Sequence, residues 1–291
     1  MKEQRDFSDK KKRVREAVES FLTKKFADYP DTKVCRAAKY AVLGGGHRWR
    51  PIVAVAAGEI FDPGALEIGL PGACGVELAH AASLVLDDLP SMDDADLRRG
   101  KEATHRVFPA WAVDMAPVFL VTMAYQISLN NNRATADRRV RAAQELSRAG
   151  LSMIFGQVAD VQQEHGYDEG RLLDFYMLKS GALYAASGKA GAILCGASRS
   201  DAEIVYDACM NLGVAYQIMD DVADVTTVVD EIGKRPGKDV NKVTAINLFG
   251  VDGARRKCSI LQERGLALLS PFGAEADWLR ALILEASWKT S

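Results

Sequence analysis

The sequence predicts an all-α protein, and three observations support this fold class. Apolar residues recur at intervals of three and four over most of the 291 residues, as they do in helices that bury one face. Alternation of β-branched residues with a period of two is almost absent, and the nearest case, residues 225–229, is short and has no partner strand nearby. No stretch is rich enough in Pro, Gly or Ser to be a linker between domains. We therefore expect residues 1–291 to form a single helical domain.

Each helix is predicted from its apolar stripe and from turn residues at its ends. The first begins after the basic run 10–13, interpreted as a solvated face, and its stripe consists of Val14, Val18, Phe21, Leu22 and Phe26. Further helices are expected at about 33–43, 50–60, 72–88, 115–130, 136–164, 169–195, 201–228, 251–268 and 275–288. Turn chemistry separates them at Gly44–Gly46, Asp62–Gly64, Pro71–Gly72, Asn130–Asn132, Gly166–Gly170, Arg235–Gly237 and Pro271–Gly273.

The composition excludes several classes of protein. Hydrophobic residues make up 48% of the chain and charged residues 26%, as in ordinary soluble globular proteins. The formal net charge of −2 provides no overall field that would attract nucleic acid or an anionic membrane. A bound anion must therefore be held by local groups, and we expect no nucleic-acid partner.

The location of the protein is predicted from its cysteines and its apolar stretches. The five cysteines are far apart and lack the spacing of metal ligands, which argues against disulfides and structural zinc. The N-terminal residues lack the apolar core of a signal peptide. The longest apolar stretch, 115–125, contains Pro117 and is shorter than the roughly 18 residues of a membrane span. We expect a cytoplasmic protein without a membrane span.

Two acidic clusters are the most distinctive feature of the sequence. The first contains Asp87, Asp88, Asp93, Asp94 and Asp96, and the second contains Asp220, Asp221 and Asp224 within an apolar run. In a helix Asp220 and Asp224 share one face. Carboxylates among apolar neighbours need compensating cations, and Mg²⁺ is usually held by one or two carboxylates together with substrate phosphates. The clusters therefore predict a magnesium site that binds a phosphorylated substrate.

Basic residues accompany both clusters, and phosphates need such donors. Arg98 and Arg99 follow the first cluster, and Lys234, Lys238 and Lys242 follow the second. The alternative is that each cluster is a charged helix end in water. Two clusters, each preceded by an apolar helix, favour the binding site over that alternative.

Five segments together resemble the trans-isoprenyl diphosphate synthases, and most of all the bacterial-type geranylgeranyl diphosphate synthases. Residues 87–100 are similar to the first Asp-rich motif in its longer form, DDxxxxD followed by RRG, and residues 217–224 to the QxxDDxxD motif. Residues 45–51 are similar to GGKRxRP, residues 179–183 to KTGAL, and Gly156, Gln157 and Asp160 to GQxxD. These matches keep the order of the family over residues 40–245.

The resemblance implies a fold, a reaction and partners. The fold is an all-α bundle of the isoprenoid synthase type around a deep central cavity, usually in a homodimer. Mg²⁺, three ions carried by the diphosphate, binds an allylic diphosphate (dimethylallyl, geranyl or farnesyl) between the two Asp motifs. The allylic diphosphate ionises, isopentenyl diphosphate adds its double bond, and loss of a proton leaves a chain five carbons longer.

The resemblance also implies roles for individual residues. The metal ligands would be Asp87, Asp88, Asp93, Asp220 and Asp224, with Asp221 in support. The residues implied in catalysis are Asp87, Asp88, Asp220, Lys179 and Gln217. The allylic diphosphate would be bound by Arg98, Lys179, Ser180, Gln217, Lys234 and Lys242. Isopentenyl diphosphate would be bound by His47, Arg50, His80 and Arg99, although His80 on its own reads as a core histidine. His47 stands where the family has lysine, which replaces a permanent charge by a mostly neutral group.

Product length is predicted from one turn of helix. Ala82 and Ser83 lie one turn before Asp87, where the growing tail would pass, and both side chains are small. The next large candidates that could stop the tail are Phe119, Met123 and Tyr125. We therefore expect a twenty-carbon product, geranylgeranyl diphosphate. A farnesyl diphosphate synthase, a terpene cyclase and a non-catalytic partner subunit of the same fold are the alternatives.

Overall fold

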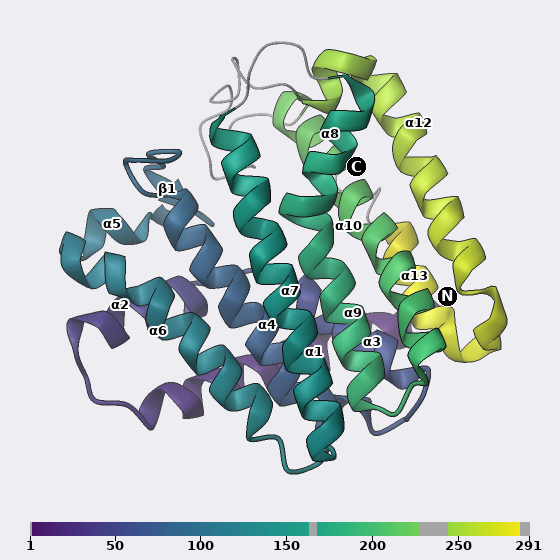
Figure 1. Cartoon of the computed structure of the whole chain (residues 1–291), viewed down its shortest axis with the longest axis horizontal. Coiled ribbons are helices and arrows are strands. Elements are labelled where there is room, and N and C mark those ends of the chain that lie inside the picture. Colours follow the sequence, from purple (N-terminus) through teal and green to yellow (C-terminus); the bar gives the residue numbers. More distant parts are fainter. Residues whose placement is uncertain (1, 163–167, 227–243, 286–291) are drawn as a thin grey trace.

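The computed structural model describes residues 2–162, 168–226 and 244–285, and it confirms the all-α fold (Figure 1). The α-helices are α1 (Lys2–Ala27), α2 (Lys33–Leu43), α3 (Trp49–Glu59), α4 (Ala65–Asp87), α5 (Thr104–Val107), α6 (Ala110–Leu129), α7 (Ala136–Val161), α8 (Glu169–Tyr176), α9 (Ala182–Leu194), α10 (Arg199–Thr226), α12 (Ala245–Leu268) and α13 (Asp277–Glu285). A π-helical turn, Met177–Gly181, joins α8 to α9, and a 3₁₀ segment, Ser270–Ala276, precedes α13.

Side-chain caps explain where several helices begin. The side chains of Thr32, Thr135, Asp168 and Thr244 accept hydrogen bonds from the backbone in the first turns of α2, α7, α8 and α12. Such caps satisfy N–H groups that have no partner within the helix. The capped starts of α2, α7 and α8 are predicted correctly from the sequence, whereas α12 begins at Ala245 instead of 251.

Helix α9 is the centre of the bundle. Every one of its residues, from Ala182 to Leu194, is buried, and it packs against α3, α4, α7 and α10. Figure 1 shows α4, α6, α7, α9, α10 and α12 running in similar directions, with α12 and α13 at one side and α2, α5 and α6 at the other. One apolar cluster contains residues from α1 through α13, and a second contains residues of α8, α10 and α12. The number of domains stays a prediction.

Several predicted boundaries are wrong, including the starts of α6 and α12, which begin at Ala110 and Ala245 instead of 115 and 251. Helix α1 begins at Lys2, before the basic run rather than after it, and the run is not merely a solvated face. The Nζ atoms of Lys10 and Lys11 lie 2.7 and 2.6 Å from carboxylate oxygens of Glu59 and Glu285. Helix α4 begins at Ala65, so Pro71–Gly72 lies inside a helix instead of breaking one. The single helix expected at 169–195 is interrupted by the π turn.

A short hairpin was not expected from the sequence. Strand β1 (Leu97–Arg98) pairs antiparallel with β2 (Lys101–Glu102), with Leu97 opposite Glu102. Arg99 and Gly100 form the two-residue connection, and their φ angles of 55° and 74° are both positive, as a type I′ hairpin turn requires. The tight turn places Arg99 at the tip of the hairpin.

Helices α4 and α6 are long and apolar enough, by length and composition, to cross a membrane. In α4, 61% of the most apolar window is buried inside the bundle, and in α6 the value is 50%. Core helices of folded bundles pass the same test. The expectation of no membrane span therefore stays a prediction.

Candidate active site

The two acidic clusters occupy helix ends, and the π turn lies between them. Asp87 ends α4, and Asp220 lies in the last two turns of α10. In the π turn, Lys179 interacts electrostatically with Asp87. The hydroxyl of the next residue, Ser180, donates a hydrogen bond of 2.5 Å to Oε1 of Gln217 on α10. Lys179 thus faces the first cluster, and Ser180 reaches the second through Gln217, whose Nε2 donates to Asp221.

The first cluster folds back on the end of α4. The backbone N–H of Asp93 donates to the carbonyl of Asp87 at 2.9 Å, so the Asp93 side chain comes near Asp87. The pKa of Asp87 is raised to about 6: burial is the main cause and Asp93 and Asp88 add to it, whereas Lys179 and Arg98 act in the opposite direction. Asp87 is therefore a carboxylate whose negative charge is poorly compensated by the protein.

Asp88 differs from its neighbour because Arg98 already compensates its charge. Asp88 is 2% exposed, and Nε of Arg98 lies 3.0 and 3.1 Å from its two carboxylate oxygens. Burial alone would lower the pKa of Arg98, but the Asp88 carboxylate, followed by Asp87 and Asp93, raises it. The forked pairing fixes the Arg98 guanidinium beside the first cluster.

The remaining acids of the first cluster lie further from its centre. Arg106 donates to Asp96 at 2.5 Å, and Nε2 of His105 lies 3.8 Å from Asp94. Asp94 has a positive φ of 43°. These contacts hold the loop that turns back toward the hairpin.

The second cluster divides its three carboxylates between two environments. Asp220 is half-buried and Asp224 is exposed, and they share a face of α10 one turn apart. Asp221 is buried and accepts hydrogen bonds from Nε2 of Gln217 at 3.2 Å, from the backbone N–H of Ala245 at 2.9 Å and from the Tyr176 hydroxyl. The pKa of Asp221 is raised to about 6, because the effect of burial exceeds the lowering by these hydrogen bonds. Asp221 therefore anchors α12 and α8 to α10.

The π turn is held from α7. Lys179 pairs with Asp160, and a Cβ atom at Gly156 would lie only 2.6 Å from the backbone nitrogen of Lys179. The glycine of the GQxxD segment thus lets α7 approach the π turn closely, and its aspartate holds the lysine. Single π turns are frequent at functional sites.

A basic group of four residues lies beside the first cluster: Arg50, His80, Arg98 and Arg99. Burial lowers the pKa of His80 well below its ordinary value, and the charges of Arg50, Arg99 and Arg98 lower it further. Burial also lowers the pKa of Arg99. Nε of Arg50 is buried without a hydrogen-bond partner, and its guanidinium lies 4.5 Å from the ring centre of Tyr184. An anion bound here would relieve the repulsion between these groups.

The sequence-predicted residues are only partly brought together. His47 is exposed, and its carbonyl accepts a hydrogen bond of 3.1 Å from Arg15. Lys234, Lys238 and Lys242 lie outside the described residues. Ala82 is buried, and the hydroxyl of half-buried Ser83 donates to the His80 carbonyl at 2.9 Å.

One buried ion pair next to the basic group is not predicted by the sequence analysis. Arg48 and Glu77 are 2% and 1% exposed and pair with each other. A lone glutamate in the apolar run of α4, three residues before His80, was the signal available in the sequence. Its partner is 29 residues away, so no local pattern relates the two.

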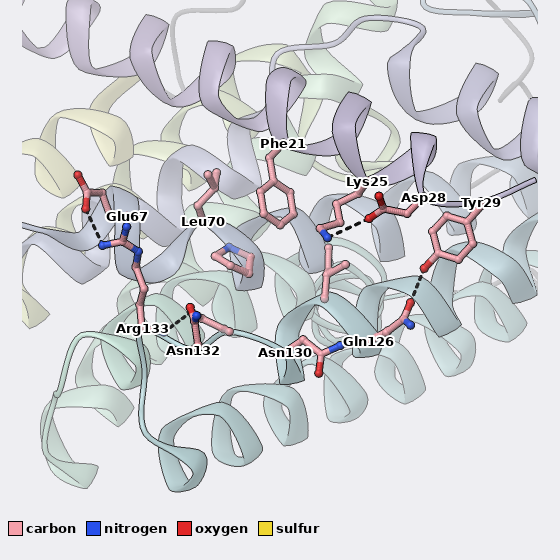
Figure 2. A pocket seen from close by; sticks show the side chains of 13 residues that line it. Phe21, Lys25, Asp28, Tyr29, Glu67, Leu70, Gln126, Asn130, Asn132 and Arg133 are labelled. Atoms are coloured by element: carbon pink, nitrogen blue, oxygen red, sulfur yellow. Dashed lines mark hydrogen bonds and ion pairs between the residues drawn. The ribbon is translucent and has the colours of Figure 1, made fainter.

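A large pocket lies elsewhere in the molecule, at the start of α4 (Figure 2). It has a volume of about 510 Å³, and Phe21, Leu70 and Ile127 contribute apolar surface to it. Figure 2 shows its charged residues paired with one another, Lys25 with Asp28 and Arg133 with Glu67, at 3.0 and 2.9 Å. This pocket is remote from Asp87, so it is not the deep central cavity that the resemblance implies, and that cavity stays a prediction.

Comparisons with known proteins identify the family of the chain. The polyprenyl synthetase family model matches residues 31–264. A mitochondrial geranylgeranyl pyrophosphate synthase 6 of Arabidopsis thaliana is 36% identical over 258 residues, covering 84% of this chain and 76% of that protein. The farnesyl diphosphate synthase of Bacillus subtilis is 32% identical over 282 residues, covering 94% of each. The apo crystal structure of an FPP/GFPP synthase from Zymomonas mobilis has a TM-score of 0.84 at 26% identity, covering 97% of this chain and 99% of that one.

The family match includes both acidic clusters, the π turn and the basic group. The predicted resemblance is confirmed, while the two named relatives carry different product names. On this evidence the chain belongs to the polyprenyl synthetase family and is a trans-prenyltransferase.

Proposed function

We propose that this prenyltransferase joins isopentenyl diphosphate to an allylic diphosphate and that its main product is geranylgeranyl diphosphate. The observation that carries the first part is the pairing of two anion-binding environments. One combines the acidic clusters with Lys179 and Arg98, and the other is the basic group around His80. A terpene cyclase binds one diphosphate and has no need for the second environment. A non-catalytic subunit has no need for either.

The carboxylates fit a hard divalent cation such as Mg²⁺. Oxygen atoms are the ligands that Mg²⁺ prefers, and the raised pKa of Asp87 marks a charge that a cation would compensate. Among the described residues no group of three or more His, Cys, Asp or Glu could hold a metal alone, and Mg²⁺ sites are commonly completed by substrate phosphates. When bound, the metal stabilises negative charge on the leaving diphosphate. Three ions remain our expectation.

The residues of the chain then bind and orient the substrates. Lys179, Ser180 and Gln217 hold the allylic diphosphate between the clusters, and Arg98 contributes a guanidinium fixed by Asp88. The allylic C–O bond breaks, and its electron pair leaves with the diphosphate. The double bond of isopentenyl diphosphate, held by Arg50, His80 and Arg99, forms the new C–C bond, and a proton passes to the released diphosphate. Exclusion of water protects the allylic cation.

The proposed product length is supported by the small residues of α4. Below Asp87, helix α4 presents Ser83, Ala82, Ala79 and Gly75. A Cβ atom at Gly75 would lie 2.3 Å from the hydroxyl oxygen of Ser128 and 3.0 Å from the carbonyl oxygen of Ala124, so α6 closes tightly on α4 at this level. Twelve residues of helix span about 18 Å. An extended twenty-carbon prenyl chain, advancing ~1.2 Å for each main-chain bond, has about the same length.

Phe119, one of the residues expected to stop the growing prenyl tail, packs elsewhere. Its ring packs against Phe26 and Tyr29 of the N-terminal region, with ring centres 6.3 and 5.0 Å apart. Met123 is buried and Tyr125 is half-buried. We therefore propose that the growing tail stops where Gly75 of α4 meets Ser128 of α6.

The test is to incubate the protein with Mg²⁺, isopentenyl diphosphate and each allylic starter, and to size the products. We expect dimethylallyl, geranyl or farnesyl diphosphate to be extended to twenty carbons. Ala82→Phe should shorten the main product by one isoprene unit, whereas Leu86→Phe, at a position 43% exposed, should not. A fifteen-carbon product from the wild type would favour the farnesyl diphosphate synthase alternative, which the relative from Bacillus subtilis supports. Absence of any elongation would overturn the proposed function.

We also propose that the enzyme is a cytoplasmic homodimer. Support for the dimer comes from apolar side chains exposed on neighbouring helices, Met115 and Val118 on α6 and Ile154 and Phe155 on α7, with exposures of 56–67%. A second copy that covered them would remove a large apolar patch from water. All five cysteines are free, which suits a reducing compartment. Light scattering of the wild type and of Phe155→Lys would test the dimer, since a monomeric wild type contradicts it.

A further inference from the structure

We propose that Glu77 is a positioning residue for isopentenyl diphosphate, and that it acts through Arg48 to hold Arg99 in place. The inference rests on the proposed function, because it assigns Arg99 to the second substrate. It concerns two residues, Glu77 and Arg48, whose side chains are buried beside the basic group.

The first step is the contact between Glu77 and Arg48. The Arg48 side chain is completely buried, and its Nη1 donates to Oε1 of Glu77. Its remaining nitrogens are also occupied: Nε donates to Glu19 at 2.8 Å and Nη2 to the Val42 carbonyl at 2.6 Å. Each of the three guanidinium nitrogens of Arg48 therefore contacts a protein group, and the buried side chain holds these groups together.

The second step leads from Arg48 to the loop before α3. Arg48 is the N-cap of α3 and has a positive φ of 53°, a conformation that non-glycine residues adopt only when their surroundings enforce it. Gly45 and Gly46, just before it, also have positive φ angles. The contacts of the Arg48 side chain with Glu77, Glu19 and Val42 provide that enforcement, so they fix the course of residues 44–48.

The third step leads from the loop to Arg99. Nη1 of Arg99 donates to the carbonyl of Gly45 at 2.5 Å, and its guanidinium lies against Gly46, where a Cβ atom would be 2.7 Å from Cζ. Glu77 also faces Arg99 directly, since its Oε1 lies 3.9 Å from Nη2. The Arg99 guanidinium thus packs against the loop that Arg48 holds in place.

The charge of Glu77 serves the same purpose. Burial and the charges of Arg48, Arg98 and Arg50 lower the pKa of Arg99, and Glu77 raises it. Without this carboxylate, Arg48 and Arg99 would repel each other across the loop. Glu77 therefore lets two arginines lie close together while one of them stays available to an anion.

The experiment compares Glu77→Gln with the wild type by steady-state kinetics, by calorimetric titration with isopentenyl diphosphate alone, and by thermal unfolding. We expect the KM and the Kd for isopentenyl diphosphate to rise about tenfold, as for one lost charge-assisted hydrogen bond. The KM for the allylic diphosphate should stay within about twofold, because Glu77 contacts none of its ligands. Arg48→Lys should give the same selective loss, since an ammonium cannot reproduce the guanidinium fork.

Glu145→Gln is the matched control. Glu145 is also buried, at 6% exposure, and it pairs with two cations, Arg148 at 2.5 Å and Lys189 at 3.3 Å. It lies in α7, and neither of these cations belongs to the basic group. It should lower the melting temperature and leave both KM values unchanged. If Glu77→Gln behaves like this control, or raises both KM values equally, Glu77 is merely structural and the inference is wrong.

A double variant and the behaviour of the wild type decide between the remaining outcomes. Should Glu77→Gln fail to fold, the double variant Glu77→Gln with Arg48→Gln leaves no unpaired charge in this contact, and it must show the same selective loss for the inference to stand. A wild type that neither binds nor elongates isopentenyl diphosphate would overturn the proposed function and, with it, this inference. A wild type that elongates normally, beside a Glu77→Gln variant without selective loss, would overturn the inference alone.

Discussion

Asp88 and Asp221 occupy equivalent places in two Asp-Asp pairs, yet the structure holds them in different ways. In each pair the first aspartate, Asp87 or Asp220, is half-buried, and the second is buried. Arg98 compensates the charge of Asp88, whereas Asp221 accepts three hydrogen bonds from neutral donors. The comparison teaches that the second carboxylate of each pair secures the local fold, one by charge and the other by neutral hydrogen bonds. The first carboxylate of each pair is only half-buried, and it is the one that our proposal assigns to the bound diphosphate and its metal.

The largest expected effect tests the first member of each pair. Asp87→Ala and Asp220→Ala should each lower kcat/KM by about 10²–10³-fold or more, as removal of one transition-state stabilising group does. The free energy of unfolding should change less than in variants of Asp88 and Asp221, because Asp87 and Asp220 are only half-buried. Product formation at saturating Mg²⁺ measures this effect. Near wild-type turnover of either variant would contradict the assignment of that cluster.

The next prediction compares how much Asp88 and Asp221 contribute to the free energy of unfolding. Asp88→Asn leaves Arg98 without its partner and should lower the free energy of unfolding by about 3 kcal/mol. Asp221→Asn removes less, about 1–2 kcal/mol, because its donors are neutral and the amide keeps one acceptor. Urea unfolding at pH 7 measures both values. As a control, Asp88→Asn combined with Arg98→Gln should recover part of the loss, and equal losses in the two single variants would break the comparison.

The smallest effect is a difference in pH dependence. The pKa of Asp221 is raised to about 6, so the folded protein binds a proton more tightly than the unfolded chain. Its contribution to stability is fully present below about pH 4 and is lost as the pH rises through about 6. Between pH 4.5 and 6.5 the loss should be about 1–2 kcal/mol and absent from Asp221→Asn. Urea unfolding of the metal-free protein at pH 4.5 and 6.5 measures it, and an unchanged pH slope in Asp221→Asn would exclude this cause.

Much of the fold could be predicted because its signals are local. The bounds of α2 follow from Thr32 before it and Gly44 after it, and both residues act within one turn. The start of α4 could not be predicted in this way. Burial of Ala65 and Gly69 in the bundle extends the helix through Pro71, so tertiary packing overrides a local breaker. The hairpin strands are two residues long, too short to show any alternation.

The candidate site likewise combines features that are local in sequence with contacts that are not. Both acidic clusters are contiguous in sequence, so their composition alone marks them. The partners that give each residue its role come from far away: Asp88 and Arg98 meet through a loop, and Asp221 contacts Tyr176 at a separation of 45 residues. No periodicity within one segment contains such pairs. The sequence therefore predicts which residues form the site better than it predicts what each of them does.

The π turn at Met177–Gly181 also makes the position of Lys179 sensitive to the number of residues in the chain. A π turn holds one residue more than an α-helical turn, and each residue of an α-helix rotates the following side chains by about 100°. Deleting a single residue, such as Leu178, would merge α8 and α9 into one regular helix and swing Lys179 away from Asp160. Such a chain could keep its fold and lose its chemistry. The length of the chain at this turn therefore sets the direction of the Lys179 side chain.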